Sequence, residues 1–208
     1  LSGRDPNSTT RHRDVKNGGA RAAVLGAGDG LITNVSLVLG VAGASANAST
    51  VRLAGVAGLL AGAFSMGAGE LVSVRAQQEL AQKELQVERQ ELADEPEAEM
   101  RELAAMYRAR GVPAGDAMTV ARILSANEKV ALDTHARLEL GIDPEAAGAP
   151  VKAAVFSFVS FTIGAVLPLL PWFFTLGSAA VVLSIVIGAL AALLLGAFIG
   201  AMAGRSVP

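Results

Sequence analysis

Four stretches of the chain are apolar over the length of a membrane crossing. They lie at about residues 22–46, 51–74, 151–172 and 174–203, and consist mainly of Ala, Gly, Leu and Val. A helix rises 1.5 Å per residue, so about 20 residues cross a hydrocarbon core of about 30 Å. Helices satisfy their own backbone hydrogen bonds, as lipid requires. The pattern therefore predicts an all-α polytopic membrane bundle with four spans.

A polar insert at residues 75–150 separates the second span from the third. It is expected to be helical, starting as a continuation of the second span and breaking at Pro96. The stretch "RGVPAGD" ends the next helix, and another begins near Asp116. "SANE", with Ser125 as the N-cap, predicts a capping box for a last helix that stops at Gly141. The expected plan is a basic tail (1–21), two spans (22–74), the cytoplasmic helical insert (75–150) and two more spans (151–208).

The positions of Lys and Arg predict how the chain is oriented in the membrane. Five lie in the tail and nine in the insert, and Lys152 and Arg205 fall on the same side of the membrane. Only Arg52 lies on the other side. Because basic loops stay in the cytoplasm, the tail and the insert are expected to be cytoplasmic. The Ala-, Gly- and Arg-rich composition favours a bacterial cell membrane, and the absence of cysteine excludes thiolate metal ligands.

Carboxylates are concentrated in the insert at residues 84–103, "ELQVERQELADEPEAEMREL". Residues three or four apart share one face of a helix, and like charges at that spacing destabilise it. Three pairs have this spacing: Glu88 with Glu91, Glu99 with Glu102, and His135 with Glu139. A divalent cation between them would remove the repulsion, and carboxylates with one imidazole suit Mn²⁺ or Fe²⁺. The alternative is an ordinary solvated acidic surface.

Two acids, Asp29 and Glu70, lie inside the predicted spans. Charged groups at membrane depth cost at least about 2.5 kcal/mol, so they usually line a pathway or find a partner. Met66 shares the helix face of Glu70 and adds a thioether. The alternative is that both acids reach the lipid headgroups. Asn34 either continues a polar lining or bonds a neighbouring helix.

Two stretches resemble the vacuolar iron transporter family of Fe²⁺ and Mn²⁺ transporters. They are "DGLITNVSLVLGVAGA" at residues 29–44 and "GLLAGAFSMGAGELVSV" at residues 58–74. The resemblance implies an all-α homodimer that exchanges the metal for protons and moves it out of the cytosol. It also implies a cytoplasmic metal-binding domain in the place of the insert. The family has five spans, and this sequence stops after four, so the fifth helix is expected to be missing.

The resemblance also implies roles for single residues. Asp29 matches a transport aspartate and Met66 a transport methionine. The residues that match metal-binding glutamates are Glu88, Glu91, Glu99, Glu102 and Glu139. His135 stands where the family pattern has methionine, and Gly58 where some members have glutamate. Either Glu70 replaces that glutamate or the coupling to protons differs.

The function expected from these features is a proton-coupled antiporter for Fe²⁺ or Mn²⁺. Its partners would be divalent metal ions, protons, the lipid bilayer and a second copy of the chain, with no nucleic acid and no enzymatic activity. The alternative is a membrane-tethered metal buffer or sensor without transport. An oxidase of ferritin type is disfavoured, because such sites use Glu-x-x-His pairs and here His135 precedes Glu139 by four residues.

Overall fold

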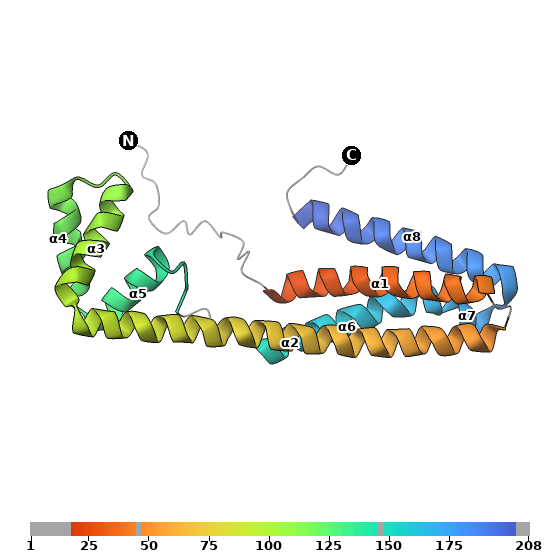
Figure 1. Ribbon diagram of the computed structural model, residues 1–208. Coiled ribbons are helices and arrows are strands. Elements are labelled where there is room, and N and C mark those ends of the chain that lie inside the picture. The colour runs from red at the N-terminus through yellow and green to blue at the C-terminus, as the bar shows by residue number, and fades with distance from the viewer. Residues whose placement is uncertain (1–17, 45–46, 145–147, 203–208) are drawn as a thin grey trace, which may run out of the picture. The chain divides into compact units, whose positions relative to one another are not determined.

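A computed structural model describes residues 18–44, 47–144 and 148–202, and every regular element in these ranges is a helix (Figure 1). The basic tail up to residue 17 and Arg205 lie outside the described residues. The chain divides into two compact units, which are residues 1–70 with 151–208, and residues 71–150. The helices are α1 (Gly18–Ala44), α2 (Ala48–Asp94), α3 (Pro96–Ala109), α4 (Ala114–Ser125), α5 (Glu128–Leu138), α6 (Pro150–Leu169), α7 (Pro171–Phe174) and α8 (Gly177–Met202).

Four helices in the described residues, α1, α2, α6 and α8, are long and apolar enough to cross a membrane. Large apolar residues are exposed on them, such as Phe64, which is 65% exposed, and Leu194, which is 71% exposed. Lipid tails are a suitable surrounding for such a surface. The predicted all-α membrane bundle is confirmed. The apolar part of α2 ends before Arg75, and the 47-residue helix is far longer than one crossing requires.

The third span ends earlier than the hydrophobic pattern predicts. α6 stops at Leu169 instead of Trp172, and α8 begins at Gly177 instead of Phe174. Pro171 has no backbone N–H to continue α6, and it occupies the first turn of the short helix α7 instead. Gly177 has φ = +60°, a conformation that favours glycine, and this allows the chain to turn into α8.

Glycines bring the membrane helices close together. A Cβ atom added to Gly30 of α1 would collide with the carbonyl group of Phe161 in α6, and one added to Gly164 would collide with that of Ala27. At Gly58 and Gly62 of α2, an added Cβ would instead collide with the side chains of Leu37 and Phe161. Small residues at such positions permit the close contact on which helix association in lipid depends.

A Gly30→Ala substitution is expected to destabilise the membrane unit by about 1–3 kcal/mol, the usual cost of overpacking. The added methyl group meets backbone, which cannot move aside. Thermal unfolding of the detergent-solubilised protein would measure the effect. Gly40→Ala on the same helix is the matched control, because a Cβ there meets nothing within 4 Å. Equal melting temperatures for the two variants would contradict the described packing of α1 against α6.

The unit of residues 71–150 is a small helical domain. α3 packs against α4, and α4 against α5. Its core contains Leu103, Ala104 and Ala121, surrounded by partly buried side chains that include several methionines. The chain breaks between α2 and α3 at Pro96, as predicted, and Gly111 follows α3 with φ = +94°.

The start of α5 corrects one prediction. Ser125 is the last residue of α4, so it cannot serve as the N-cap of the next helix. Asn127 is the N-cap instead, and its side-chain oxygen accepts a hydrogen bond from the backbone N–H of Val130 at 3.2 Å.

Candidate metal centre

The helices of the insert place the acidic pairs around one histidine. Glu88 and Glu91 lie on the last part of α2, and Glu99 and Glu102 lie on α3, after the break at Pro96. His135 lies in the last turn of α5, and Glu139 is the C-cap of that helix. Three helices that are separate in the sequence thus contribute to one cluster.

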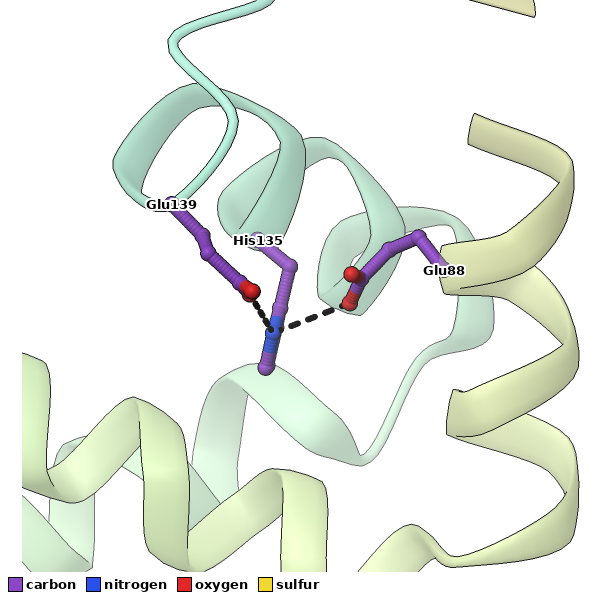
Figure 2. A group of neighbouring side chains, drawn as sticks. All are labelled: Glu88, His135 and Glu139. Atoms are coloured by element: carbon purple, nitrogen blue, oxygen red, sulfur yellow. Dashed lines mark ion pairs between the residues drawn. The ribbon is translucent and has the colours of Figure 1, made fainter. Parts of the chain in front are cut away.

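Three carboxylates converge on the same nitrogen atom of His135. Its Nδ1 atom lies 3.0 Å from Oε1 of Glu88, 3.5 Å from Oε2 of Glu139 and 3.6 Å from Oε2 of Glu99. Figure 2 shows Glu88 and Glu139 pointing at the imidazole ring from either side. Glu88, His135 and Glu139 each offer one ligand atom, and these three atoms lie within 4.8 Å of one another.

The centre of the cluster is buried. His135 is fully inaccessible to solvent and Glu88 is 2% exposed, whereas Glu139 is an exposed residue. Oε1 of Glu88 and both ring nitrogens of His135 lack a hydrogen bond of good geometry in the structure. Buried polar atoms normally have such partners, so Oε1 of Glu88 and Nδ1 of His135, which lie 3.0 Å apart, are available to bind a cation.

Burial and neighbouring charges change the acidity of the cluster. The pKa of Glu88 is raised to about 7, chiefly because burial disfavours its charged form. The nearby carboxylates add to this shift; in decreasing order they are Glu139, Glu99, Glu91 and Glu102. Burial also raises the pKa of Glu99, although His135 opposes this change.

Two of the predicted ligands lie further from the centre. Glu91 and Glu102 are exposed, and the ion pairs of His135 do not include them. Both act on the pKa of Glu88 through their charge, which places them around the same cluster. The structure therefore groups Glu88, Glu99, His135 and Glu139 tightly, with Glu91 and Glu102 on the solvent side.

Two arginines outside the predicted site, Arg110 and Arg137, fix the end of α5. The guanidinium of Arg110 donates to the carbonyl oxygens of Met106 at 3.0 Å and Leu138 at 3.1 Å, so it joins the last turn of α3 to the residue before Glu139. Arg137 forms ion pairs with Asp133 at 2.9 Å and Asp143 at 2.8 Å. Spacing along a helix predicts the pair of Asp133 and Arg137, which are four residues apart, but it does not reveal the contacts of Arg110 with Leu138 or of Arg137 with Asp143.

The three transport residues predicted in the spans, Asp29, Met66 and Glu70, are not linked by contacts like those around His135 in the part of the chain that the structure describes. Asp29 is exposed and accepts a hydrogen bond from Oγ1 of Thr33 at 3.2 Å. Met66 packs against the core that contains Phe161 and Ala165, and Glu70 is half-buried. Within the described residues, no hydrogen bond or ion pair connects Asp29, Met66 and Glu70.

Asn34 bonds a neighbouring helix, which was one of the two alternatives for this residue. Its side chain is 1% exposed, and Nδ2 donates to the carbonyl oxygen of Ala165 in α6 at 2.6 Å. The amide thus ties α1 to α6.

The donor set of the cluster fits a divalent cation. Around an octahedral ion with ligand distances of about 2.1 Å, neighbouring donors are roughly 3 Å apart. The distances from Nδ1 of His135 to the three carboxylates range from 3.0 to 3.6 Å. A cation would also offset the mutual repulsion of the acids. Carboxylates with a single imidazole suit Mn²⁺, Fe²⁺ and similar ions.

A cation bound here would compete with a proton on Glu88. We expect the affinity of the full chain for Mn²⁺ to rise as the pH increases through about 7, the pKa of this carboxyl group. Below pH 7 one proton must leave for each ion bound, so the affinity falls by about tenfold per pH unit. Calorimetric titration in two buffers of different ionisation enthalpy measures both the affinity and the released protons. Equal affinities at pH 6 and pH 8 would contradict this coupling.

Comparison with known proteins identifies the family. The sequence model of the VIT family matches residues 20–208 of this chain. A vacuolar iron transporter of Acanthamoeba castellanii is 40% identical over 153 residues, which are 74% of this chain and 55% of that protein. Vacuolar iron transporter 1 of Arabidopsis thaliana is 30% identical over 152 residues, which are 73% of this chain and 61% of that protein.

A vacuolar iron transporter of Toxoplasma gondii is 32% identical over 164 residues, which are 76% of this chain and 53% of that protein. The chain thus spans between about half and two thirds of the length of these three relatives. All three come from eukaryotes, so they give no support to the expected bacterial membrane. The family match covers both the apolar helices and the acidic insert, and the chain belongs to the vacuolar iron transporter (VIT) family.

Proposed function

We propose that this protein transports Fe²⁺ or Mn²⁺ across a membrane, out of the cytosol and in exchange for protons. The observation that carries the proposal is the convergence of Glu88, Glu99 and Glu139 on the buried His135. The names of the relatives, vacuolar iron transporters, support iron as the transported ion.

The insert is proposed to collect the metal before it enters the membrane. Its candidate ligands all lie within residues 71–150, so the proposed site needs no ligand from the spans. The nine Lys and Arg residues of the insert, against Arg52 alone on the opposite side, support a cytosolic location. The rim residues Glu91 and Glu102 are exposed and are suited to the first capture of an ion from solution.

Asp29, Met66 and Glu70 are the proposed transport residues of the spans. A carboxylate in an apolar helix binds a cation when ionised and releases it when protonated, which is the chemistry that proton exchange requires. Met66 adds a soft thioether, which transition metals accept more readily than Mg²⁺ or Ca²⁺ do. No catalytic role is assigned to any residue.

A second copy of the chain is proposed to cover part of α1. Asp29, Thr33 and Ser36 are exposed on one face of this helix. A carboxylate facing lipid is costly, so a protein partner is a better surrounding for it. A homodimer that pairs these faces would place two Asp29 side chains along a shared path.

Metal flux into proteoliposomes tests the proposal. We expect Mn²⁺ or Fe²⁺ to accumulate, with protons moving in the opposite direction as reported by a pH-sensitive dye. Binding without flux would overturn the transport proposal and favour the alternative, a membrane-tethered metal buffer. The position of all the candidate ligands within the insert, apart from the spans in sequence, is the observation that favours this alternative.

A further inference from the structure

Arg52 lies near the start of α2, at the end of the spans that is predicted to face away from the cytoplasm. Side chains on a helix lean toward its N-terminus. Accordingly, Nε of Arg52 donates to the carbonyl oxygen of Ala48 at 3.2 Å, one turn nearer to the start of α2. The guanidinium is thus drawn toward the end of the helix, as long basic side chains at a membrane boundary are.

A buried core places an aromatic ring beside this guanidinium. Val51 of α2 and Trp172 of α7 belong to the same cluster of buried residues. Their neighbours in the sequence, Arg52 and Phe173, meet next to it, and the guanidinium carbon lies 5.9 Å from the centre of the ring. A cation within about 6 Å of an aromatic face is attracted to it. Figure 1 shows α7 at the end of the membrane unit where α2 begins.

The charge of Arg52 has no acidic partner. The sequence has no Asp or Glu between Asp29 and Glu70, and none after Glu145. Asp29 and Glu70 each lie more than about 20 Å along their helices from this end of the spans, at 1.5 Å per residue. In the parts of the chain that the structure describes, the two Nη atoms of Arg52 have no hydrogen-bond acceptor and no carboxylate within ion-pair distance.

A guanidinium in this position requires an anion from its surroundings. It has five N–H donors, and an unpaired charge close to hydrocarbon is costly. The positive end of the dipole of α2 lies one turn away, and the first turn of this helix contains no acid. Both features favour an anion, and the fork of the arginine side chain matches the oxygen atoms of a phosphate group.

The surface around Arg52 is suited to a lipid. Leu53 is 73% exposed on α2, and Phe174 of α7 is 81% exposed. Acyl chains that cover these side chains would bring the phosphate of their headgroup to the level of Arg52. A zwitterionic headgroup also carries an ammonium group, for which this end of the spans offers no carboxylate. An anionic headgroup has no such cation and fits the site better.

We propose that Arg52, held by Phe173 and the start of α2, binds the phosphate group of an anionic phospholipid in the leaflet that faces away from the cytoplasm. This inference goes beyond the proposed function and does not depend on it, because none of the residues assigned to metal binding or transport takes part.

The single tryptophan of the chain, Trp172, is a local reporter for this site, since it precedes Phe173. The full chain would be reconstituted into vesicles that contain brominated phosphatidylglycerol or brominated phosphatidylcholine, because bromine quenches tryptophan fluorescence only at short range. We expect phosphatidylglycerol to be favoured next to Trp172 by about fivefold, the preference that one basic residue near a lipid surface provides. Equal quenching by the two lipids would overturn the proposal.

Two substitutions on α2 show whether Arg52 causes the preference. Arg52→Gln is expected to make the two lipids quench equally. Arg75→Gln is the matched control and should keep the preference, because it also removes one positive charge, but its guanidinium already pairs with Glu79 at 3.1 Å. An unchanged preference in a folded Arg52→Gln protein would overturn the role of Arg52. Helical content and elution volume show whether that variant is folded, and the measurement on the unsubstituted chain does not depend on it.

Inorganic phosphate distinguishes a lipid headgroup from a free anion. Added in excess to the vesicles, it should leave the quenching by brominated phosphatidylglycerol unchanged, because the acyl chains hold the lipid against the exposed apolar side chains. Relief of the quenching by inorganic phosphate would show that the site takes a free anion, and would overturn its assignment to a lipid.

Discussion

An Asp29→Asn variant is expected to lose metal flux into proteoliposomes, while metal binding by the insert stays at the level of the unsubstituted chain. The amide keeps the shape of the carboxylate but removes its charge and its ability to exchange a proton. A unit charge pair at 4 Å contributes about 4 kcal/mol at an effective dielectric constant of 20. Losing an interaction of this free energy in the transport step is expected to lower the flux by at least about a hundredfold.

The control for this experiment is Asp116→Asn, which makes the same chemical change on α4 of the insert, away from the cluster. It should transport normally. Flux at the normal rate in the Asp29→Asn variant would contradict the assignment of Asp29 to the transport path. If the variant lost both metal binding and flux, the spans and the insert would not act separately.

A Glu88→Gln variant is expected to show the largest loss of metal affinity among the six predicted ligands of the insert. Glu88 is the most deeply buried of the acids, and it has the shortest distance to His135. Its removal should weaken Mn²⁺ binding by about a hundredfold at pH 8 and should flatten the pH dependence, because the carboxyl group that titrates near 7 is gone.

The order of the other variants follows from their positions. Glu99→Gln and Glu139→Gln should come next, since both carboxylates lie within 3.6 Å of the same nitrogen atom. Glu91→Gln and Glu102→Gln, on the exposed side, should have smaller effects. Glu97→Gln is a control in the first turn of α3, outside the cluster. Titration calorimetry gives the ranking, and a Glu91→Gln variant that binds more weakly than Glu88→Gln would contradict it.

Much of the fold could be predicted from the sequence because it depends on local patterns. The four apolar segments, the break at Pro96 and the turn at Gly111 each follow from the chemistry of a few neighbouring residues. The errors were also local. Ser125 fits the capping-box pattern, but α4 extends through it, and the N-cap passes to Asn127. Pro171 ends α6 before the tryptophan that the hydrophobic pattern had included.

The composition of the metal cluster could be predicted only in part. Spacing places Glu88 with Glu91, and Glu99 with Glu102, on common helix faces. It cannot show which member of each pair turns toward His135, because that depends on how α3 and α5 pack. Nor does it reveal that Glu88 is buried and Glu91 exposed. Arg110, which joins α3 to α5, has no signal in the sequence beyond its charge.

The most direct test of the proposed metal binding is anomalous X-ray diffraction from crystals of the full chain grown with Mn²⁺. We expect a peak within about 2.3 Å of Nδ1 of His135 and of an oxygen atom of Glu88, with Glu99 and Glu139 as the next neighbours. Saturating Mn²⁺ with no peak between these side chains would contradict the central claim that the acidic helices of the insert converge on a divalent cation.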